Sequence, residues 1–427
     1  MSGELTPAFT DGIAKVYLGD ALGVLRDLPD ASVHCCVTSP PYWGLRDYGL
    51  GAEGIGLEPT PEEWLARLVE VFREVRRVLR PDGTLWLNVG DTYSAGKAKH
   101  PDASGGADLG WSNEQSRRTA KPKDLLMLPA RLALALQADG WYLRSDIIYA
   151  KPNPMPESVR DRPTSAHEHV FLLSRSPRYF YDAEAIVEAG TTTRPEQLAF
   201  GERPDVGFPG RVNDRRRAKP PAGWDLSVGQ GGHTASGRFK HDARGERHEG
   251  VDDCWQPIEE RIIRNARNVW TIATQGYPEA HFATMPEGLA RRCISAGTSE
   301  YGCCSECGAQ WQRVVDRQYV NPGNRSTNGP RSVDRAHLEH GSAGYKARLE
   351  LRTSTSGWAP SCRHQKALTR PSIVLDPFAG SGTTLAVAKA LNRDSIGIEL
   401  QPDYLPLIVR RLEGKSAQVV LPLEATA

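Results

Sequence analysis

Four residues, Ser39, Pro40, Pro41 and Tyr42, end an apolar run and open the stretch SPPYWGLRDYG. A nucleobase amine is a weak nucleophile because its lone pair is conjugated into the ring. Hydrogen-bond acceptors aimed at its N–H groups would free that lone pair, and the Ser39 hydroxyl and the Pro40 carbonyl could supply two. The prolines fix φ and lack a competing N–H, and Tyr42 could stack on a base swung out of a duplex. The alternative interpretation is a rigid corner that buries aromatic side chains.

A second candidate site is the glycine loop in VLDPFAGSGTT (374–384). Gly380 and Gly382 allow a ligand to approach the backbone at a helix start. The loop lacks the lysine of a phosphate-binding loop, and Leu385 occupies the third glycine position of a dinucleotide fingerprint. Glu399 ends the next expected strand, where it could accept both ribose hydroxyls of an adenosine. These features favour a ligand with adenosine and a carboxylate but no phosphate, such as S-adenosylmethionine; the alternative is an ordinary tight turn.

A third candidate is a cysteine cluster in the later part of the chain. Cys304 and Cys307 have the Cys-x-x-Cys spacing of a zinc knuckle, and Cys362 and His364 follow in SCRH. In a reducing compartment such a cluster favours a metal over a disulfide. The pattern predicts a tetrahedral structural zinc site with three cysteines and one histidine, although the short Cys-x-His spacing leaves the fourth ligand open. Unliganded surface thiols are the alternative.

Composition sets the class of protein. The chain has 427 residues, 39% of them hydrophobic and 25% charged, which is ordinary for a soluble globular protein of two or three domains. It has no apolar run of membrane-spanning length, and its N-terminus lacks a signal-peptide pattern. We therefore expect a cytoplasmic protein with no membrane partner. The net charge of +1 does not exclude nucleic acid, because a basic face can exist within a neutral total.

Strand and helix patterns alternate along the parts of the chain that carry the first two candidate sites. This alternation predicts an α/β fold with a doubly wound, mostly parallel sheet. Strands are expected at 15–20, 32–39, 84–91, 142–151, 372–376 and 395–400, and helices at 21–28, from Thr60 to Pro81, at 123–138 and from 383. The residues between these blocks are rich in Gly, Pro, Arg and polar side chains, at about 183–265 and 312–370.

The order of these motifs resembles that of the β-class DNA amino-methyltransferases, which modify cytosine N4 or adenine N6. In that family a (D/N/S)PP(Y/F) motif precedes an FxGxG motif, with a target-recognition region between them. The resemblance covers most of residues 14–413. It includes GDALGVLRDLPDASVHCCVTSPPY, KPNPMPESVRDRPTSAHEHVFLLSRSPRYFYD (151–182), RNVWTI (267–272), HFATMPEGLARRCISAGT (281–298) and DPFAGSGTT.

The resemblance implies a Rossmann-like S-adenosylmethionine methyltransferase fold and a role for each motif residue. Ser39 to Tyr42 would form the catalytic corner. Glu399 would hold the cofactor ribose, Asp20 the adenine amine and Thr284 the cofactor carboxylate. The methionine side of the pocket would be formed by Asp376, Phe378, Gly380 and Gly382.

Five segments are expected from the motif positions. They are a catalytic half of the core (1–182), a target-recognition region (183–265), a core segment that contributes to the cofactor pocket (266–300), a zinc-binding insertion (301–370) and a cofactor-binding half (371–427).

The target base is expected to be cytosine. A serine in the first motif position leans towards cytosine N4 in this family, whereas aspartate leans towards adenine N6, which stays the alternative. Cytosine C5 chemistry needs a cysteine beside a proline, and the sequence has no Pro-Cys dipeptide. More remote alternatives are an inactive zinc-stabilised DNA-binding regulator, or methylation of RNA or of a protein glutamine amide.

Basic residues suggest where double-stranded DNA would lie. Arg215, Arg216 and Arg217 fall in the expected target-recognition region and could read guanine or grip phosphates, although such runs are also common on solvated faces. Lys151, Arg160 and Arg162 lie in a proline-stiffened segment that could form another DNA-side loop. The expected partners are duplex DNA, with base flipping, and a cognate restriction endonuclease, and the expected state is a monomer or homodimer.

Overall fold

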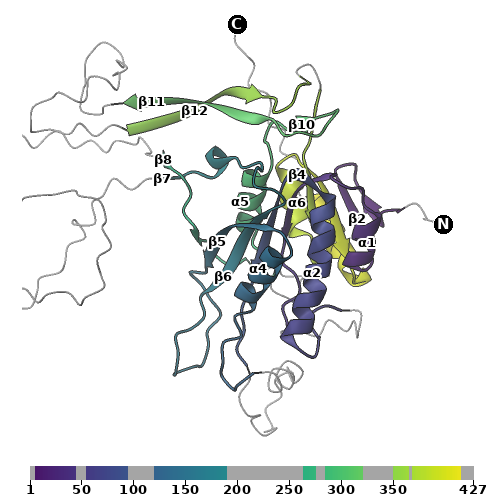
Figure 1. The fold of residues 1–427 in the computed structure, drawn as a ribbon, viewed down its shortest axis with the longest axis vertical. Coiled ribbons are helices and arrows are strands. Elements are labelled where there is room, and N and C mark those ends of the chain that lie inside the picture. Colours follow the sequence, from purple (N-terminus) through teal and green to yellow (C-terminus); the bar gives the residue numbers. More distant parts are fainter. Residues whose placement is uncertain are drawn as a thin grey trace, which may run out of the picture. The chain divides into compact units, whose positions relative to one another are not determined.

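A nine-stranded sheet positions both motifs, with strand order β1-β2-β15-β14-β3-β4-β6-β5-β9 among the described residues (Figure 1). The structure is a computed structural model that describes residues 5–44, 54–94, 120–189, 263–275, 284–320, 350–364 and 368–414. Most of the expected target-recognition region, including Arg215, Arg216 and Arg217, lies outside these residues. No helix within them is long and apolar enough to cross a membrane.

The sheet strands are β1 (Phe9–Thr10), β2 (Ala14–Leu18), β3 (Val33–Thr38), β4 (Leu79–Val89), β5 (Tyr142–Ala150), β6 (His167–Ser174), β9 (Val269–Thr271), β14 (Ile373–Asp376) and β15 (Asp394–Glu399). The helices are α1 (Ala21–Asp27), α2 (Pro61–Val78), α4 (Leu128–Ala138), α5 (Glu287–Gly297), α6 (Thr383–Ala390) and α7 (Leu405–Gly414), with short 3-10 helices at Ala183–Ile186 and Pro402–Tyr404. Three two-stranded sheets pair β7 (Glu188–Ala189) with β8 (Ile263–Arg264), β10 (Cys303–Cys304) with β13 (Thr369–Arg370), and β11 (Gln312–Val320) with β12 (Glu350–Ala359).

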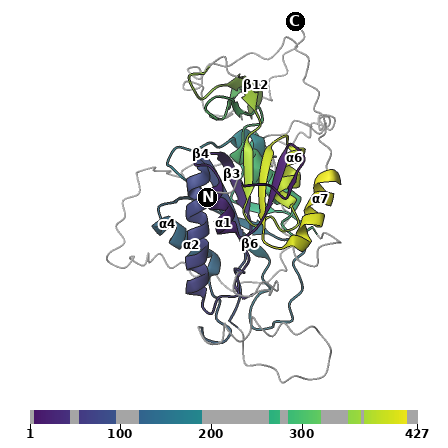
Figure 2. The same cartoon turned by 90° about the vertical axis from the view of Figure 1, so that its right-hand side faces the viewer.

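The predicted doubly wound α/β fold is confirmed. Strands β2, β15, β14, β3 and β4 are parallel neighbours, and helices cover both faces of the sheet (Figure 2). Along β3, Val33 and Cys36 pack in the apolar cluster that contains α1, α2 and α4, whereas Cys35 and Val37 pack in the cluster that contains α5 and part of α6. Both faces of β3 are therefore buried, which explains its continuous apolar run.

Helix α2 begins where its sequence predicts. The Thr60 hydroxyl accepts a hydrogen bond from the Glu63 amide at 3.2 Å, and Pro61 takes the first turn. The expected end at Pro81 is wrong, because the helix stops at Val78 and β4 starts at Leu79. Trp64 is buried in the apolar face of α2, and its indole Nε1 donates to the Pro41 carbonyl at 3.0 Å. This helix therefore supports the Ser-Pro-Pro-Tyr corner directly.

Three parts of the fold differ from the predicted pattern. Helix α4 begins at Leu128 instead of residue 123, because Met127 has φ 55°, a left-handed conformation that no helix continues through. Strand β6 lies antiparallel between β4 and β5, which the βα alternation does not predict. Part of the segment expected to be loop-rich (312–370) is the antiparallel hairpin of β11 and β12.

Candidate active site and metal centre

The Ser-Pro-Pro-Tyr corner and the glycine loop lie side by side at the carboxyl ends of parallel strands. β3 ends at Thr38 and β14 ends at Asp376, and the two strands are neighbours. The Thr38 hydroxyl donates to the Asp376 carboxylate at 2.7 Å, although the residues are 338 positions apart in the chain. Ligands of open α/β sheets bind at this edge. The fold thus brings the two sequence motifs into contact.

Tyr42 connects the corner to the neighbouring strands. Its hydroxyl accepts from the Ser39 hydroxyl at 3.1 Å and from the Asn88 amide at 3.1 Å, and it donates to Glu168 at 3.1 Å. Gly90 makes room for the ring, since a Cβ at that position would lie 2.7 Å from Tyr42 Cε2. Sequence reasoning missed Asn88 and Glu168. The signal that could have found Glu168 was a carboxylate beside the apolar run of HEHVFLLS.

Lys151 lies at this network instead of extending freely from a DNA-side loop. Its ammonium group forms an ion pair with Glu168, and its side chain is 21% exposed. Arg162 pairs with Glu157 and lies over the Tyr93 ring, with its guanidinium carbon 3.8 Å from the ring centroid. Arg160 is exposed. The three basic residues thus have different surroundings, and contact with DNA stays a prediction for each of them.

The corner is held rigidly on its far side. Pro40 is buried, and the Pro41 carbonyl accepts from Trp64 as described above. Trp43 is 1% exposed, and its indole donates to the Glu58 carbonyl at 2.8 Å. The Glu58 carboxylate in turn accepts from the Gly56 amide at 2.8 Å and from Arg67 at 3.2 Å. These bonds restrain the backbone of the corner, as a preorganised site requires.

The glycine loop places two carboxylates around the start of α6. Asp376 accepts from Thr38 and from the Phe378 amide at 3.1 Å, and the Phe378 ring lies edge-on to Phe72. Glu399 accepts from the Gly380 amide at 2.8 Å and from the Gln401 amide at 2.9 Å. Both carboxylates are buried, and in its ionised form either one would favour a sulfonium or ammonium group at this edge of the sheet.

Both glycines of the loop have left-handed φ angles, 52° at Gly380 and 78° at Gly382. A Cβ at Gly382 would also lie 3.0 Å from Ile408 in α7. Arg411, another α7 residue, is buried and donates to the hydroxyls of Ser381 and Thr383. The loop therefore needs glycine for its turn and is fixed from behind by α7.

Asp20 and Thr284 complete the predicted cofactor residues. Asp20 follows β2, whose Leu18 pairs in register with Glu399, so these two acids lie at the same edge of the sheet. Asp20 caps α1 through the Gly23 amide at 2.9 Å and lines an open depression of about 380 Å³ together with Leu22, Ile55 and Val71. Thr284 donates to the Gln275 carbonyl at 3.2 Å, and the preceding residues 281–283 lie outside the described ranges.

Burial changes the titration of both loop carboxylates. Desolvation raises the pKa of Asp376 to about 6, against the opposing hydrogen bonds from Thr38 and Thr384. Desolvation also raises the pKa of Glu399 to about 7, against the backbone hydrogen bonds from Gln401 and Gly380. Burial therefore disfavours the charged forms of both carboxylates, and such perturbed pKa values are common at functional sites.

This environment gives a pH dependence with a defined sign. The folded protein keeps the Glu399 proton up to about pH 7, whereas the unfolded chain releases it near pH 4.5. The wild type therefore loses stability across this window relative to Glu399→Gln, by roughly 2–3 kcal/mol between pH 4.5 and 7. Urea unfolding of both proteins without ligand at several pH values measures the difference. A difference that stays constant from pH 4.5 to 8 would contradict the raised pKa.

The four predicted metal ligands lie together. The sulfur atoms of Cys304, Cys307 and Cys362 and a ring nitrogen of His364 are all within 4.8 Å of one another. A tetrahedral zinc ion holds such ligands roughly 3.5–4 Å apart, because each lies about 2.0–2.3 Å from the metal. His364 Nδ1 is 3.7 Å from the Cys304 sulfur, and its Nε2 is 3.5 Å from Glu306. A carboxylate behind a ligand histidine is common at zinc sites, so the donor set fits zinc.

The cysteine cluster is attached to the core by specific hydrogen bonds. The buried His34 in β3 accepts the Ile373 amide at Nδ1, 2.9 Å away, so its Nε2 donates to the Gly308 carbonyl at 3.0 Å. Burial, followed by the charge of Arg80, lowers the pKa of His34 to about 3, which keeps this ring neutral. Arg80 also donates to the Cys307 carbonyl at 2.8 Å. The cluster thus docks near the start of β3, the end opposite Ser39.

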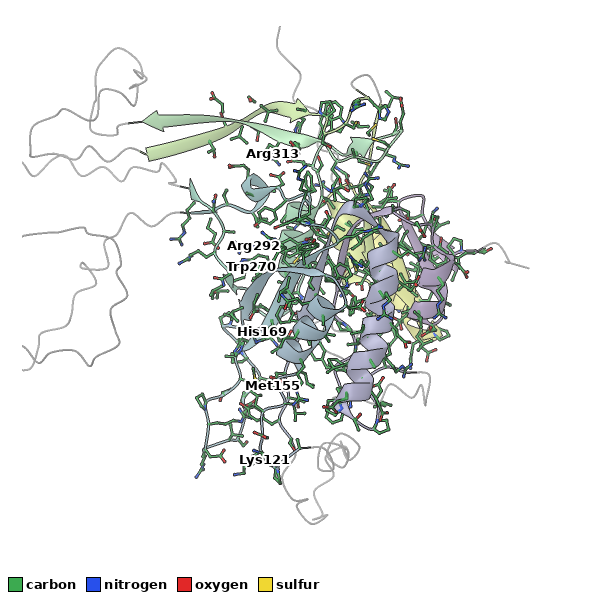
Figure 3. All side chains as sticks on the ribbon, in the orientation of Figure 1. Lys121, Met155, His169, Trp270, Arg292 and Arg313 are labelled. Carbon is green, nitrogen blue, oxygen red and sulfur yellow. The ribbon has the colours of Figure 1, made fainter. Side chains whose placement is uncertain are left out.

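A charged cluster lies at the base of the expected target-recognition region. Glu188 in β7 pairs with Arg292 at 2.8 Å, with Arg267 at 3.1 Å and with Arg264 at 3.5 Å. Arg292 also lies over the Trp270 ring, 4.6 Å from its centroid, and both are labelled in Figure 3. These ion pairs join the paired strands β7 and β8 to α5.

Comparison with known proteins identifies the family. A family model described as a DNA methylase, of the N6/N4 type, matches residues 33–304 and 365–410 and leaves the cysteine cluster and hairpin largely unmatched. The type II methyltransferase M.Cfr9I of Citrobacter freundii is 35% identical over 409 residues, which cover 95% of this chain and 90% of the relative. M.XycI of Xanthomonas campestris pv. cyanopsidis has the same identity and coverage.

Among solved structures, the PvuII DNA methyltransferase, described as cytosine-N4-specific, aligns with a TM-score of 0.49 and 15% identity, and the alignment covers 95% of this chain and 88% of that one. The family is established by the match of the family model and by the long sequence alignments. The chain belongs to the N6/N4 family of DNA methylases, as the resemblance of its motifs predicted.

Proposed function

We propose that the chain transfers a methyl group from S-adenosylmethionine to the N4 amine of cytosine in duplex DNA. The observation that carries this proposal is the Thr38–Asp376 hydrogen bond, because it joins the Ser-Pro-Pro-Tyr corner to the glycine loop at one sheet edge. A methyl donor in the loop would then face an amine at the corner. The known family and the chemistry of both motifs support this arrangement.

One group of residues would bind the methyl donor, and another would orient the target base. Asp376 and the loop from Phe378 to Gly382 would hold the methionine part of the donor, Glu399 its ribose and Asp20 its adenine. Thr284 would contact the donor carboxylate. The Ser39 hydroxyl and the Pro40 carbonyl would accept the two amine N–H groups, and Tyr42 would stack on or support the flipped base. The donor supplies an electrophilic methyl group when it is bound.

The base preference rests on Ser39. A neutral hydroxyl in this position leans towards cytosine N4 in the family, and adenine N6 is the second candidate. Expression of the chain in a bacterial host without DNA methylation, followed by nucleoside mass spectrometry, tests the choice. We expect N4-methylcytosine in the host DNA. The appearance of N6-methyladenine instead would overturn the base assignment but keep the methyltransferase.

The names of the relatives suggest a biological partner. Both M.Cfr9I and M.XycI are named type II methyltransferases. We therefore infer that this chain protects a DNA sequence from a cognate restriction endonuclease. DNA methylated by this chain would resist that endonuclease, and unmethylated DNA of the same sequence would be cut.

The cysteine cluster is proposed to hold one structural zinc ion. Purified protein should contain one zinc per chain, and the Cys304→Ser, Cys307→Ser double variant should lose it, because serine does not replace a thiolate ligand. Elemental analysis measures the metal, and thermal unfolding measures the loss of stability. Cys303→Ser is the matched control, since Cys303 lies outside the ligand set. Full zinc retention by the double variant would contradict the site.

A further inference from the structure

Glu168 is a carboxylate close to the catalytic corner, with a side chain that is only 17% exposed. It lies in β6, next to β4, and both of its oxygens have partners. Oε2 accepts from Tyr42 at 3.1 Å and from Asn88 at 2.8 Å, and Oε1 accepts from Lys151. The roles proposed above leave this group unused, although it ends a chain of hydrogen bonds that begins at Ser39.

The number of protons available fixes the direction of the hydrogen bonds from Ser39 through Tyr42 to Glu168. An ionised carboxylate only accepts, so the Tyr42 hydroxyl must give its single proton to Glu168. The Tyr42 oxygen then has only acceptor capacity left, and Asn88 donates to it at 3.1 Å. Ser39, also 3.1 Å away, must donate to the same oxygen. The lone pairs of the Ser39 oxygen are therefore left for an incoming N–H group.

We propose that Glu168 receives the proton that the target amine loses, through the hydroxyls of Ser39 and Tyr42. This inference rests on the proposed function, because it needs a base amine at Ser39. Glu168 acts through Tyr42 and does not touch the base. Its charge also polarises both hydroxyls, so that Ser39 becomes a stronger acceptor for the amine before the methyl group moves.

The step balances as follows. The amine nitrogen attacks the methyl carbon, the N–C bond forms as the C–S bond breaks, and the bonding pair stays on sulfur. As positive charge builds on the nitrogen during this attack, one of its protons moves to the Ser39 oxygen in the same step. Ser39 passes its own proton to Tyr42, and Tyr42 passes its proton to Glu168. Both hydroxyls are restored, and one proton has moved from the amine to the carboxylate.

The surroundings of Tyr42 favour a role in passing a proton on over a role as the base that keeps it. Burial, followed by the charge of Glu168, raises the pKa of Tyr42 well above its ordinary value, so Tyr42 stays protonated and only transmits a proton. In the part of the chain that the structure describes, Tyr42, Lys151 and Tyr149 are the titratable groups that face Glu168. Burial, followed by the charge of Glu168, raises the pKa of Tyr149 to about 12. Glu168 is thus the carboxylate at the end of the hydrogen-bond chain from Ser39 through Tyr42.

Single-turnover methyl transfer to duplex DNA, in H₂O and in D₂O with saturating S-adenosylmethionine, tests the relay in the full chain. We expect Glu168→Gln to slow transfer by about 100-fold, as is typical when a proton acceptor is removed, with little change in the affinity for DNA or donor. The wild type and Glu168→Asp should be slower in D₂O than in H₂O, and Glu168→Gln should lose this isotope effect.

Two further variants make the result decisive. Glu62→Gln, which changes an exposed ion pair with Arg131, is the matched control and should keep the wild-type rate. Tyr42→Phe keeps the Glu168–Lys151 pair but interrupts the relay, so it should reproduce the loss even if Glu168→Gln fails to fold. An unchanged rate in Glu168→Gln, or an isotope effect equal to that of the wild type, would overturn the relay while the methyltransferase stands. An inactive wild type would refute the proposed function itself.

Discussion

Replacing Ser39 with alanine is expected to lower the single-turnover rate of methyl transfer by roughly 10²–10³-fold, the usual cost of losing one preorganised polar group at a reacting centre. The substitution removes an acceptor for the amine N–H and the first hydroxyl of the Ser39–Tyr42–Glu168 chain. The backbone of the corner is held by Trp64 and Trp43, so the fold should not change. Affinity for the methyl donor should stay at the wild-type value.

The control for this variant is Ser356→Ala. Ser356 is an exposed residue of β12 whose hydroxyl donates to the Val314 carbonyl at 3.3 Å. The Ser356→Ala protein should transfer methyl groups at the wild-type rate, and its unfolding temperature should match that of the Ser39→Ala protein. If Ser39→Ala transferred methyl groups as fast as this control, Ser39 could not be the group that orients the amine.

The second large effect is expected for Asp376→Asn, which should weaken binding of S-adenosylmethionine by roughly 10–100-fold. The reason is the loss of a charge-assisted hydrogen bond, worth about 1.5–3 kcal/mol, to the ammonium group of the donor. Asparagine keeps the shape of the side chain, and its oxygen can still accept from Thr38 and Phe378. Isothermal titration calorimetry above pH 7, where the wild-type carboxylate is ionised, measures the affinity.

Asp139→Asn is the matched change outside the site. Asp139 forms an ion pair with Arg73 at the end of α4. The affinity of the Asp139→Asn protein for the donor should equal that of the wild type. Its free energy of unfolding should fall only slightly, because ion pairs near the surface contribute little. Equal affinities for Asp376→Asn and the wild type would remove Asp376 from the cofactor pocket.

Local sequence patterns predicted the elements that hold the two motifs. β3 was recognisable because both of its faces are buried, and α2 because Thr60 and Pro61 mark its start. The glycine loop was recognisable because the turns at Gly380 and Gly382 need left-handed φ angles. In each case the cause lies within a few residues of the element itself, so the sequence alone reveals it.

The rest of the site depends on contacts between distant residues. Glu168 reaches Tyr42 only because β6 pairs antiparallel with β4, and 126 positions separate the two residues in the chain. Asn88 looks like any polar residue near the end of a strand until β6 is placed beside it. The sequence context of Lys151 does not reveal its ion pair with Glu168.

The cysteine cluster also combines a local sequence pattern with contacts between distant residues. Cys304 and Cys307 have a recognisable spacing, whereas Cys362 and His364 are brought to them by the antiparallel pairing of β10 with β13 and by the β11–β12 hairpin. The Cys-x-His spacing of the second pair is unusual, so the sequence left the fourth ligand open. The structure brings His364 within 3.7 Å of Cys304.

The central claim is that the corner at Ser39 receives a DNA base amine and a methyl group from the donor in the glycine loop. The most direct measurement incubates the wild type and Ser39→Ala with duplex DNA and S-adenosylmethionine labelled in its methyl group, followed by nucleoside mass spectrometry. The wild type should place the label on the N4 atom of deoxycytidine, and Ser39→Ala should place almost none there. Unlabelled DNA from the wild type, or equal labelling by both proteins, would contradict the account.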